Sequence, residues 1–239
     1  MSATGPLVHK LVGNRQVHLD FHTSEQLYNI GNKFSKEQFQ SSLKLAHVDA
    51  VNLFAKCHHS WSYYPTAVGR MHPHLSFDLL GAQMEACREV GIKVQIYYTF
   101  GWSANDAESH PEWCVRERDG SFLTNGSLDT ESNSTELQPN FYWKFLCPNT
   151  GYHDHILAQI EELCLRYSPD GFWLDIYQAH RHCYCEACQS AMRKHGVNSN
   201  DHLAVEVFNA NNMKKHCSAI RRLVQKYHPK AQVFFNGTT

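Results

Sequence analysis

Five short runs of apolar residues divide the chain, and longer segments between them carry apolar residues three or four positions apart. Near-continuous apolar runs of this length are typical of strands buried on both faces, as in a parallel sheet. The longer segments have the period of amphipathic helices, which would cover such a sheet. The chain is therefore predicted to be an α/β protein with strands at residues 16–21, 50–55, 93–99, 171–176 and 232–236.

Capping residues mark where several helices begin and end. Ser35 and Gln38 have the spacing of a capping box, and the helix that they open is predicted to run to Leu45. Ser76 is predicted to cap a second helix, which Gly91 would end. Further helices are predicted at residues 152–167, as a short helix at 188–195, and at about 201–227.

Polar residues gather directly after each predicted strand. Active sites of (β/α) barrels lie at the carboxyl ends of the strands, so this pattern predicts a TIM-type barrel. A doubly wound sheet is the alternative, but no glycine-rich phosphate loop follows the first strand. About five strand–helix units are present, whereas a complete barrel has eight. We therefore expect one domain over residues 1–239, a partial barrel incomplete at its carboxyl end, whose open sheet edges favour a homo-oligomer.

The segment 101–148 has little periodicity and is predicted to be a long loop or lid. Tryptophan side chains stand near both of its ends, at Trp102, Trp113 and Trp143. Because large aromatic side chains in a long loop suit ligand binding, we expect this segment to contribute to a binding site.

Charge and cysteine content narrow the possible partners. The chain has 22 Lys and Arg against 23 Asp and Glu, which gives no basis for binding nucleic acid or an anionic membrane. No run approaches the roughly 20 apolar residues of a membrane span, and the amino terminus lacks an apolar signal core. Nine cysteines, several tightly clustered, favour metal ligation over disulfides and hence a cytoplasmic location.

One carboxylate, Asp175, ends the fourth apolar run, Gly-Phe-Trp-Leu-Asp. An acid at the carboxyl end of a barrel strand is where catalytic residues are found. The residues alone leave four roles open for it: nucleophile, general base, metal ligand or structural cap.

Three thiols follow that acid within a few residues, at Cys183, Cys185 and Cys188. Four thiolates in a tetrahedral arrangement make a closed structural zinc site, so a fourth cysteine is expected from elsewhere. Cys147 is the preferred fourth ligand and Cys114 the alternative. Such a zinc ion would hold the loop without taking part in the reaction.

Histidines form a second group of candidates. His18, Asp20 and His22 alternate along the first predicted strand, so they would face one side of it and could bind a metal or sugar hydroxyls. The second strand is followed by further donors and an aromatic platform, namely Lys56, His58, His59 and Trp61.

These motifs, taken together, resemble the hypothetical glycosyl hydrolase 6 family, which is allied to family-29 α-L-fucosidases and family-42 β-galactosidases. The segments that carry the resemblance span most of the chain: His18-Leu-Asp-Phe-His, Lys56-Cys-His-His, Tyr63-Tyr-Pro-Thr, His110-Pro-Glu-Trp, Leu146-Cys-Pro-Asn, Gly171-Phe-Trp-Leu-Asp and the Cys-x-Cys-x-x-Cys cluster. The Lys-Cys-His-His segment is similar to the Lys-His-His segment of the fucosidases, although Cys57 interrupts it.

The resemblance implies a retaining glycosidase with Asp175 as nucleophile, since the Gly-Phe-Trp-Leu-Asp run is similar to the nucleophile strand of the fucosidases. A second carboxyl roughly 5–5.5 Å away would act as acid and base. Glu112 is the candidate in this chain, and a residue on further strands is the alternative. The substrate would be a carbohydrate, bound by His22, Asp20, His58, His59, Trp61, Trp102, Trp113 and Tyr177.

The cysteines also contribute to the resemblance. Leu146-Cys-Pro-Asn and the later cysteines are similar to the zinc site of the family-42 enzymes, which implies Cys147 rather than Cys114 as fourth ligand of a structural zinc.

Two other readings remain open from the sequence. His18, Asp20 and His22 also resemble the first-strand metal motif of amidohydrolase or phosphoesterase barrels. The missing strands favour a carbohydrate-binding fragment without catalysis.

Overall fold

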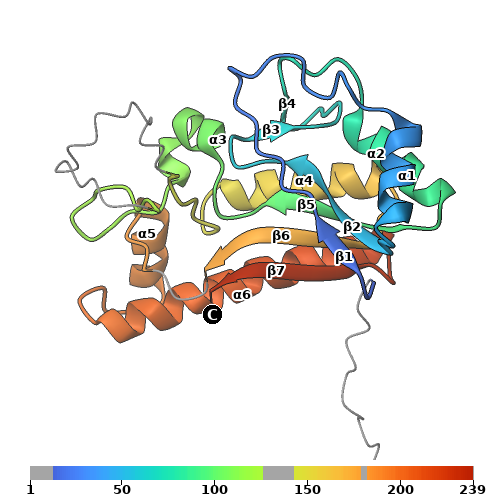
Figure 1. Ribbon diagram of the computed structural model, residues 1–239. Helices are drawn as coiled ribbons and strands as arrows, with labels where there is room; N and C mark the ends of the chain where they lie inside the picture. The colour runs from blue at the N-terminus through green and yellow to red at the C-terminus, as the bar shows by residue number, and fades with distance from the viewer. Residues whose placement is uncertain (1–12, 126–142, 179–181, 239) are drawn as a thin grey trace, which may run out of the picture.

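The computed structural model describes residues 13–125, 143–178 and 182–238, which form one sheet covered by helices (Figure 1). Five strands run parallel and neighbour one another in chain order: β1 (Gln16–His18), β2 (Ala50–Lys56), β5 (Lys93–Thr99), β6 (Gly171–Gln178) and β7 (Gln232–Thr238). Two short strands, β3 (Trp61–Ser62) and β4 (Arg70–Met71), extend the sheet beside the end of β2. The five predicted strands are confirmed, and their order is that of a (β/α) barrel.

The sheet is open over the described part of the chain, because β1 and β7 do not pair with each other. Phe234 on β7 is 46% exposed, as expected for an apolar side chain near a free edge. The partial barrel predicted from the sequence thus agrees with the structure.

Four helices cover one face of the sheet: α1 (Lys36–Leu45), α2 (Leu79–Glu89), α4 (Tyr152–Arg166) and α6 (His202–Tyr227). They pack in pairs, α1 on α2 and α4 on α6. Leu53, Ile96 and Phe172 point into the core beneath these helices. The next residue along each strand faces the other side, where Phe54, Tyr97 and Trp173 form a separate cluster. Alternation along the strands therefore separates a helix-facing core from a second face.

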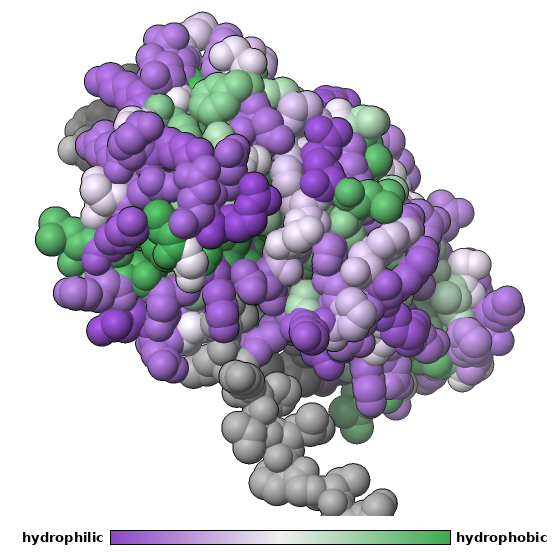
Figure 2. Space-filling model, turned by 90° about the vertical axis from the view of Figure 1, so that its right-hand side faces the viewer, coloured by the Kyte–Doolittle hydropathy of each residue, from purple (hydrophilic) through white to green (hydrophobic). Residues whose placement is uncertain are grey.

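The end of the molecule that carries α1, α2 and the amino ends of the strands is mainly hydrophilic (Figure 2). Apolar side chains on this view lie in small groups between polar ones. This end of the sheet is opposite the carboxyl ends of the strands, so it does not contribute to a site at Asp175.

Several element boundaries differ from the prediction. Strand β1 ends at His18 rather than at residue 21. Asp78, not Ser76, caps α2, because the Asp78 carboxylate accepts the backbone N–H of Gly81 at 2.8 Å. The short helix α5 is Glu186–Lys194 and begins earlier than expected. Ser35 caps α1 as predicted, because its hydroxyl accepts the backbone N–H of Gln38 at 3.2 Å, and α6 begins at His202, close to the predicted start.

The segment 101–148 is partly ordered into helical turns, where the sequence predicted a plain loop. Its first half forms α3 (Ala104–Ser109) and the 3₁₀ turn η1 (Pro111–Trp113), and isolated bridges join it to residues 144–146. Residues 126–142, in the middle of the predicted lid, lie outside the described residues.

Candidate active site

Asp175 lies at the carboxyl end of β6, and its carboxylate is held from both neighbouring strands. The Tyr97 hydroxyl on β5 donates to Oδ2 at 2.7 Å, and the Asn236 amide on β7 donates to Oδ1 at 2.6 Å. Burial, together with the Asp175 charge, raises the pKa of the Tyr97 phenol, so this group stays protonated and donates. Asp175 is 9% exposed. The carboxylate is therefore nearly buried and fixed in direction, which suits a reacting group.

Two stacked histidines lie beside this carboxylate. His58 and His22 stack with ring centroids 4.0 Å apart, and His58 Nε2 is 3.8 Å from an Asp175 oxygen. His22 Nδ1 accepts the backbone N–H of His58 at 3.2 Å, so Nε2 carries the proton that faces Asp20 at 2.8 Å. The Thr99 hydroxyl contacts His58 Nδ1 at 2.8 Å. These contacts fix both rings on the face of the sheet that carries Phe54 and Tyr97.

Burial lowers the pKa of His58 from 6.5 to about 3, so the imidazole is neutral in the folded protein near pH 7. The unfolded chain binds a proton at this position below its ordinary pKa, whereas the folded chain does not, so stability falls as the pH drops from about 6.5 toward 3. We expect His58 to account for about 1.4 kcal/mol of lost stability per pH unit in that window.

Urea unfolding between pH 7 and 4 measures this slope. His58→Gln is expected to flatten it by about that amount. The exposed His195 serves as control, since His195→Gln should leave the slope unchanged. Equal slopes for wild type and His58→Gln would contradict the assignment of a neutral, buried imidazole.

Aromatic side chains form one wall of the site. Trp102 and Trp143 lie nearly parallel with centroids 6.1 Å apart, and Trp143 packs edge-on against His59 at 4.9 Å. On the side of β3, the Trp61 indole donates to Glu25 at 3.2 Å. Indole faces suit the apolar face of a sugar ring.

Three predicted site residues lie elsewhere. Trp113 stacks on His110 at 3.8 Å and packs against α4 as part of the helix-facing core. Glu112 pairs with His110 at 3.1 Å, and no hydrogen bond or ion pair joins it to Asp175 among the described residues. Tyr177 packs on the helix-facing core as well. The structure therefore groups His22, Asp20, His58, His59 and Trp102 with Asp175 but not these three.

Lys56, which the sequence placed with the site, is instead buried on the helix side. Its Nζ is 2.6 Å from an Asp106 carboxylate oxygen and 3.3 Å from the Gln159 side-chain oxygen. Asp106 also accepts the Ser103 hydroxyl at 2.6 Å, and Ser103 contacts Ser60 at 2.6 Å. Burial would raise the pKa of Asp106, but the Lys56 charge and these hydrogen bonds lower it. The network ties the loop that carries His58 to α3.

Removing one partner of the Lys56–Asp106 ion pair should lower the free energy of unfolding more than removing one partner of an exposed ion pair. Lys56→Met leaves a buried carboxylate unpaired and is expected to lower the free energy of unfolding by about 3–5 kcal/mol. The double variant Lys56→Met/Asp106→Leu removes both charges and should recover part of the loss. Urea unfolding measures both, and a loss below about 1 kcal/mol in the single variant would contradict the pairing.

The four predicted thiols come together in one buried cluster. The sulfur atoms of Cys147, Cys183, Cys185 and Cys188 all lie within 4.8 Å of one another. Cys147 Sγ is 3.5 Å from Cys188 Sγ and 3.8 Å from Cys185 Sγ. A Zn–S bond of about 2.3 Å in a tetrahedral site places sulfurs about 3.8 Å apart, so the cluster fits zinc.

The alternative ligand, Cys114, is not part of this cluster. It lies in the helix-facing core, where its thiol donates to the Ala107 carbonyl at 3.6 Å. The structure therefore confirms Cys147 as the fourth member of the cluster.

His18, Asp20 and His22 lie near one another without forming a metal site. Asp20 is close to His22, while His18 Nδ1 contacts the Asn52 amide at 2.9 Å. Over the described residues, the four cysteines are the group of three or more ligands that converges. The amidohydrolase or phosphoesterase interpretation therefore gains no support here.

Comparison with known proteins identifies the family of the chain. The family model described as hypothetical glycosyl hydrolase 6 matches residues 35–176, more than half of the chain. The chain belongs to this family. The range matched to the glycosyl hydrolase 6 family contains Lys56, His58 and Asp175, whereas three of the four clustered cysteines lie beyond it. Comparison with curated proteins found no match.

Solved structures show the same fold. An α-L-fucosidase, isoenzyme 2 from Paenibacillus thiaminolyticus, is 38% identical with a TM-score of 0.82 over 93% of this chain and 32% of that one. The β-galactosidase from Halorubrum lacusprofundi has a TM-score of 0.61 and 14% identity over 93% of this chain and 36% of that one. The β-galactosidase from Rahnella sp. R3 has a TM-score of 0.59 and 16% identity over 84% of this chain and 33% of that one. This chain thus spans about a third of each of these proteins.

Sequence reasoning missed several residues at this site. Tyr97 and Asn236 bind the Asp175 carboxylate, and Glu25 binds Trp61. The position of Asn236 as the last residue of the fifth predicted strand was a signal that pointed to it. Within the described residues, no helix has the length and apolar content needed to cross a bilayer.

Proposed function

We propose that the protein is a retaining glycoside hydrolase that removes a terminal sugar from an oligosaccharide or glycoconjugate, with Asp175 as its nucleophile. The observation that carries this proposal is the buried Asp175 carboxylate, aimed by Tyr97 and Asn236 at the carboxyl end of a barrel strand. Family membership supports the reaction class. The similar fucosidase favours a terminal deoxy sugar such as L-fucose as the first substrate to test.

Each neighbouring side chain then has a role in binding. His22, His58 and His59 would hydrogen-bond sugar hydroxyls, and Trp61 and Trp102 would stack against the ring. Attack by Asp175 on the anomeric carbon would release the leaving group and form a glycosyl-enzyme, which water then hydrolyses. The second carboxyl is proposed to come from a residue on further strands, since Glu112 pairs with His110 at 3.1 Å and has no hydrogen bond or ion pair with Asp175 among the described residues.

The four-cysteine cluster is proposed to hold a structural zinc ion. Its coordination would be saturated by protein sulfur, so the ion would supply rigidity and no open position for substrate. A cytoplasmic location is proposed, because clustered thiols of this kind suit metal ligation in a reducing compartment.

Glycosides with a dinitrophenol leaving group test this proposal on the chain as it is. Such a leaving group departs without protonation, so the first step does not depend on which residue is the acid. A panel should include α- and β-anomers of L-fucose and D-galactose. Release of dinitrophenolate with a first-formed sugar of unchanged anomeric configuration, read by proton NMR, is expected.

Two outcomes would count against the proposal. Inversion of configuration would contradict a covalent intermediate at Asp175. Sugar binding in calorimetry without any release of dinitrophenolate would favour the non-catalytic alternative.

A further inference from the structure

The residue after Asp175 has an unusual backbone. Ile176 has φ +64°, a left-handed conformation that is costly for a β-branched residue. It is the extra residue of a β-bulge, since Asp175 pairs with Asn236 and Tyr177 with Gly237. The bulge reverses the alternation of β6 directly behind the carboxylate, and the strand then continues to pair with β7 as far as Gln178. Such strain persists only where the surroundings impose it.

Gly101 is the residue that presses on this bulge. A Cβ atom on Gly101 would lie 2.2 Å from the Ile176 carbonyl oxygen, so only glycine fits there. The backbone N–H groups of Phe100 and Gly101 both donate to the Asp175 carbonyl, at 2.9 and 3.2 Å. The turn at the end of β5 thus holds Asp175 and Ile176 together from one side.

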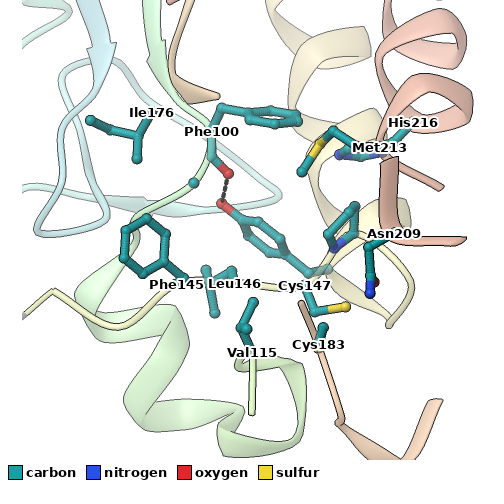
Figure 3. A pocket seen from close by; sticks show the side chains of 13 residues that line it. Phe100, Val115, Phe145, Leu146, Cys147, Ile176, Cys183, Asn209, Met213 and His216 are labelled. Atoms are coloured by element: carbon teal, nitrogen blue, oxygen red, sulfur yellow. Dashed lines mark hydrogen bonds between the residues drawn. The ribbon is translucent and has the colours of Figure 1, made fainter. Parts of the chain in front are cut away.

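The same turn is connected to the four-cysteine cluster. The Gly101 carbonyl accepts the N–H of Leu146 at 3.0 Å, and Leu146 is bonded to Cys147. Two hydrogen bonds, through Leu146 and Gly101, therefore connect the segment of Cys147, a proposed metal ligand, to the carbonyl of Asp175. Ile176, Cys147 and Cys183 also line one cavity of about 40 Å³ (Figure 3).

We propose that Gly101 is a positioning residue for Asp175, and that a metal ion in the four-cysteine cluster keeps Ile176 in its left-handed conformation through Gly101. Without the ion, the segments that carry Cys147 and Cys183 are no longer joined, and the cavity between them gives space to shift. Ile176 can then relax, and the Asp175 carboxylate turns away from Tyr97 and Asn236. The consequence for catalysis rests on the proposed function, but the coupling itself does not.

Amide hydrogen exchange tests the coupling without any assay of activity. Zinc-loaded protein and chelator-treated protein are compared at the amides of Phe100 and Gly101, with Ile96 in the middle of β5 as the reference. Metal loss is expected to lower the stability of the whole fold, so exchange at Ile96 should rise, and exchange at the two turn amides is expected to rise at least about tenfold more than at Ile96. A change confined to residues 183–188 would overturn the proposal. So would an equal rise at all three amides, because the metal would then act only through the stability of the whole fold.

A variant tests the positioning role with the metal in place. Gly101→Ala is expected to retain zinc and to lower kcat about 100-fold with KM within about twofold, since a misplaced nucleophile affects the reaction more than binding. Gly91→Ala is the control: no atom lies within 4 Å of a Cβ added to Gly91, although its φ of +73° makes alanine strained there. An unchanged kcat in Gly101→Ala would overturn the positioning role.

The proposed function and the proposed coupling can be contradicted separately. If dinitrophenyl glycosides are not hydrolysed, the proposed function fails while the exchange experiment still reports the coupling. If they are hydrolysed but hydrogen exchange at Phe100 and Gly101 does not change when the metal is removed, only the proposed coupling is wrong.

Discussion

Asp175→Asn is expected to lower kcat for dinitrophenyl glycosides on the order of 10⁴-fold, because the amide cannot form the glycosyl-enzyme. The substitution is nearly isosteric, and the Tyr97 hydroxyl and Asn236 amide that hold Asp175 both remain. Sugar affinity should therefore change little. The rate of dinitrophenolate release and calorimetric titration with the free sugar measure the two effects.

The same strand offers a matched control. Asp170 lies just before the amino end of β6, where its carboxylate accepts the N–H of Val94 at 2.9 Å. Asp170→Asn is expected to keep kcat within about twofold. Asp175→Ala with added azide gives a further test, because azide can fill the space of the lost carboxylate and attack the anomeric carbon. Loss of activity in Asp170→Asn equal to that in Asp175→Asn would remove the special role of Asp175.

The second large effect is expected at the four-cysteine cluster. Cys185→Ser removes one of four sulfurs, and zinc content should fall from about one ion per chain to well below that. Because metal binding free energy is folding free energy, the free energy of unfolding is expected to drop by more than about 4 kcal/mol. Metal analysis and urea unfolding measure these changes.

Cys114→Ser is the control for this experiment. Cys114 is fully buried, like the clustered cysteines, but lies in the helix-facing core. It should keep its zinc and lose only the smaller amount of stability that a buried polar substitution costs. Equal zinc content in Cys185→Ser and wild type would show that the cluster does not hold the metal.

Much of the fold could be predicted because it depends on local patterns. Each parallel strand is a short apolar run, and buried strands need such runs whatever their neighbours are. Asp175 is a candidate from the sequence because barrel strands present catalytic residues at their carboxyl ends, and the structure shows its carboxylate held there between β5 and β7. The sulfur cluster was predictable because Cys183, Cys185 and Cys188 are close enough in sequence to meet without knowledge of the fold.

The remaining features depend on register and on contacts between distant segments. Tyr97 is one of several aromatic residues in an apolar strand. Only the register of β5 against β6, which pairs Tyr97 with Trp173, brings its hydroxyl to Asp175. Simple alternation would put Tyr177 on the side of Asp175, but the bulge at Ile176 reverses that side. Trp113 has an aromatic partner and a core position that no local pattern specifies.

As the proposed nucleophile, Asp175 forms a covalent bond with the sugar, and trapping that bond tests its role most directly. A dinitrophenyl 2-deoxy-2-fluoroglycoside of a sugar that the protein hydrolyses should inactivate it slowly, because fluorine disfavours the oxocarbenium-like transition state. Mass spectrometry of proteolytic peptides is then the measurement. One fluorosugar per chain is expected, attached to the peptide that contains Asp175. A label on another carboxylate, or rapid turnover of the trap without any label, would contradict it.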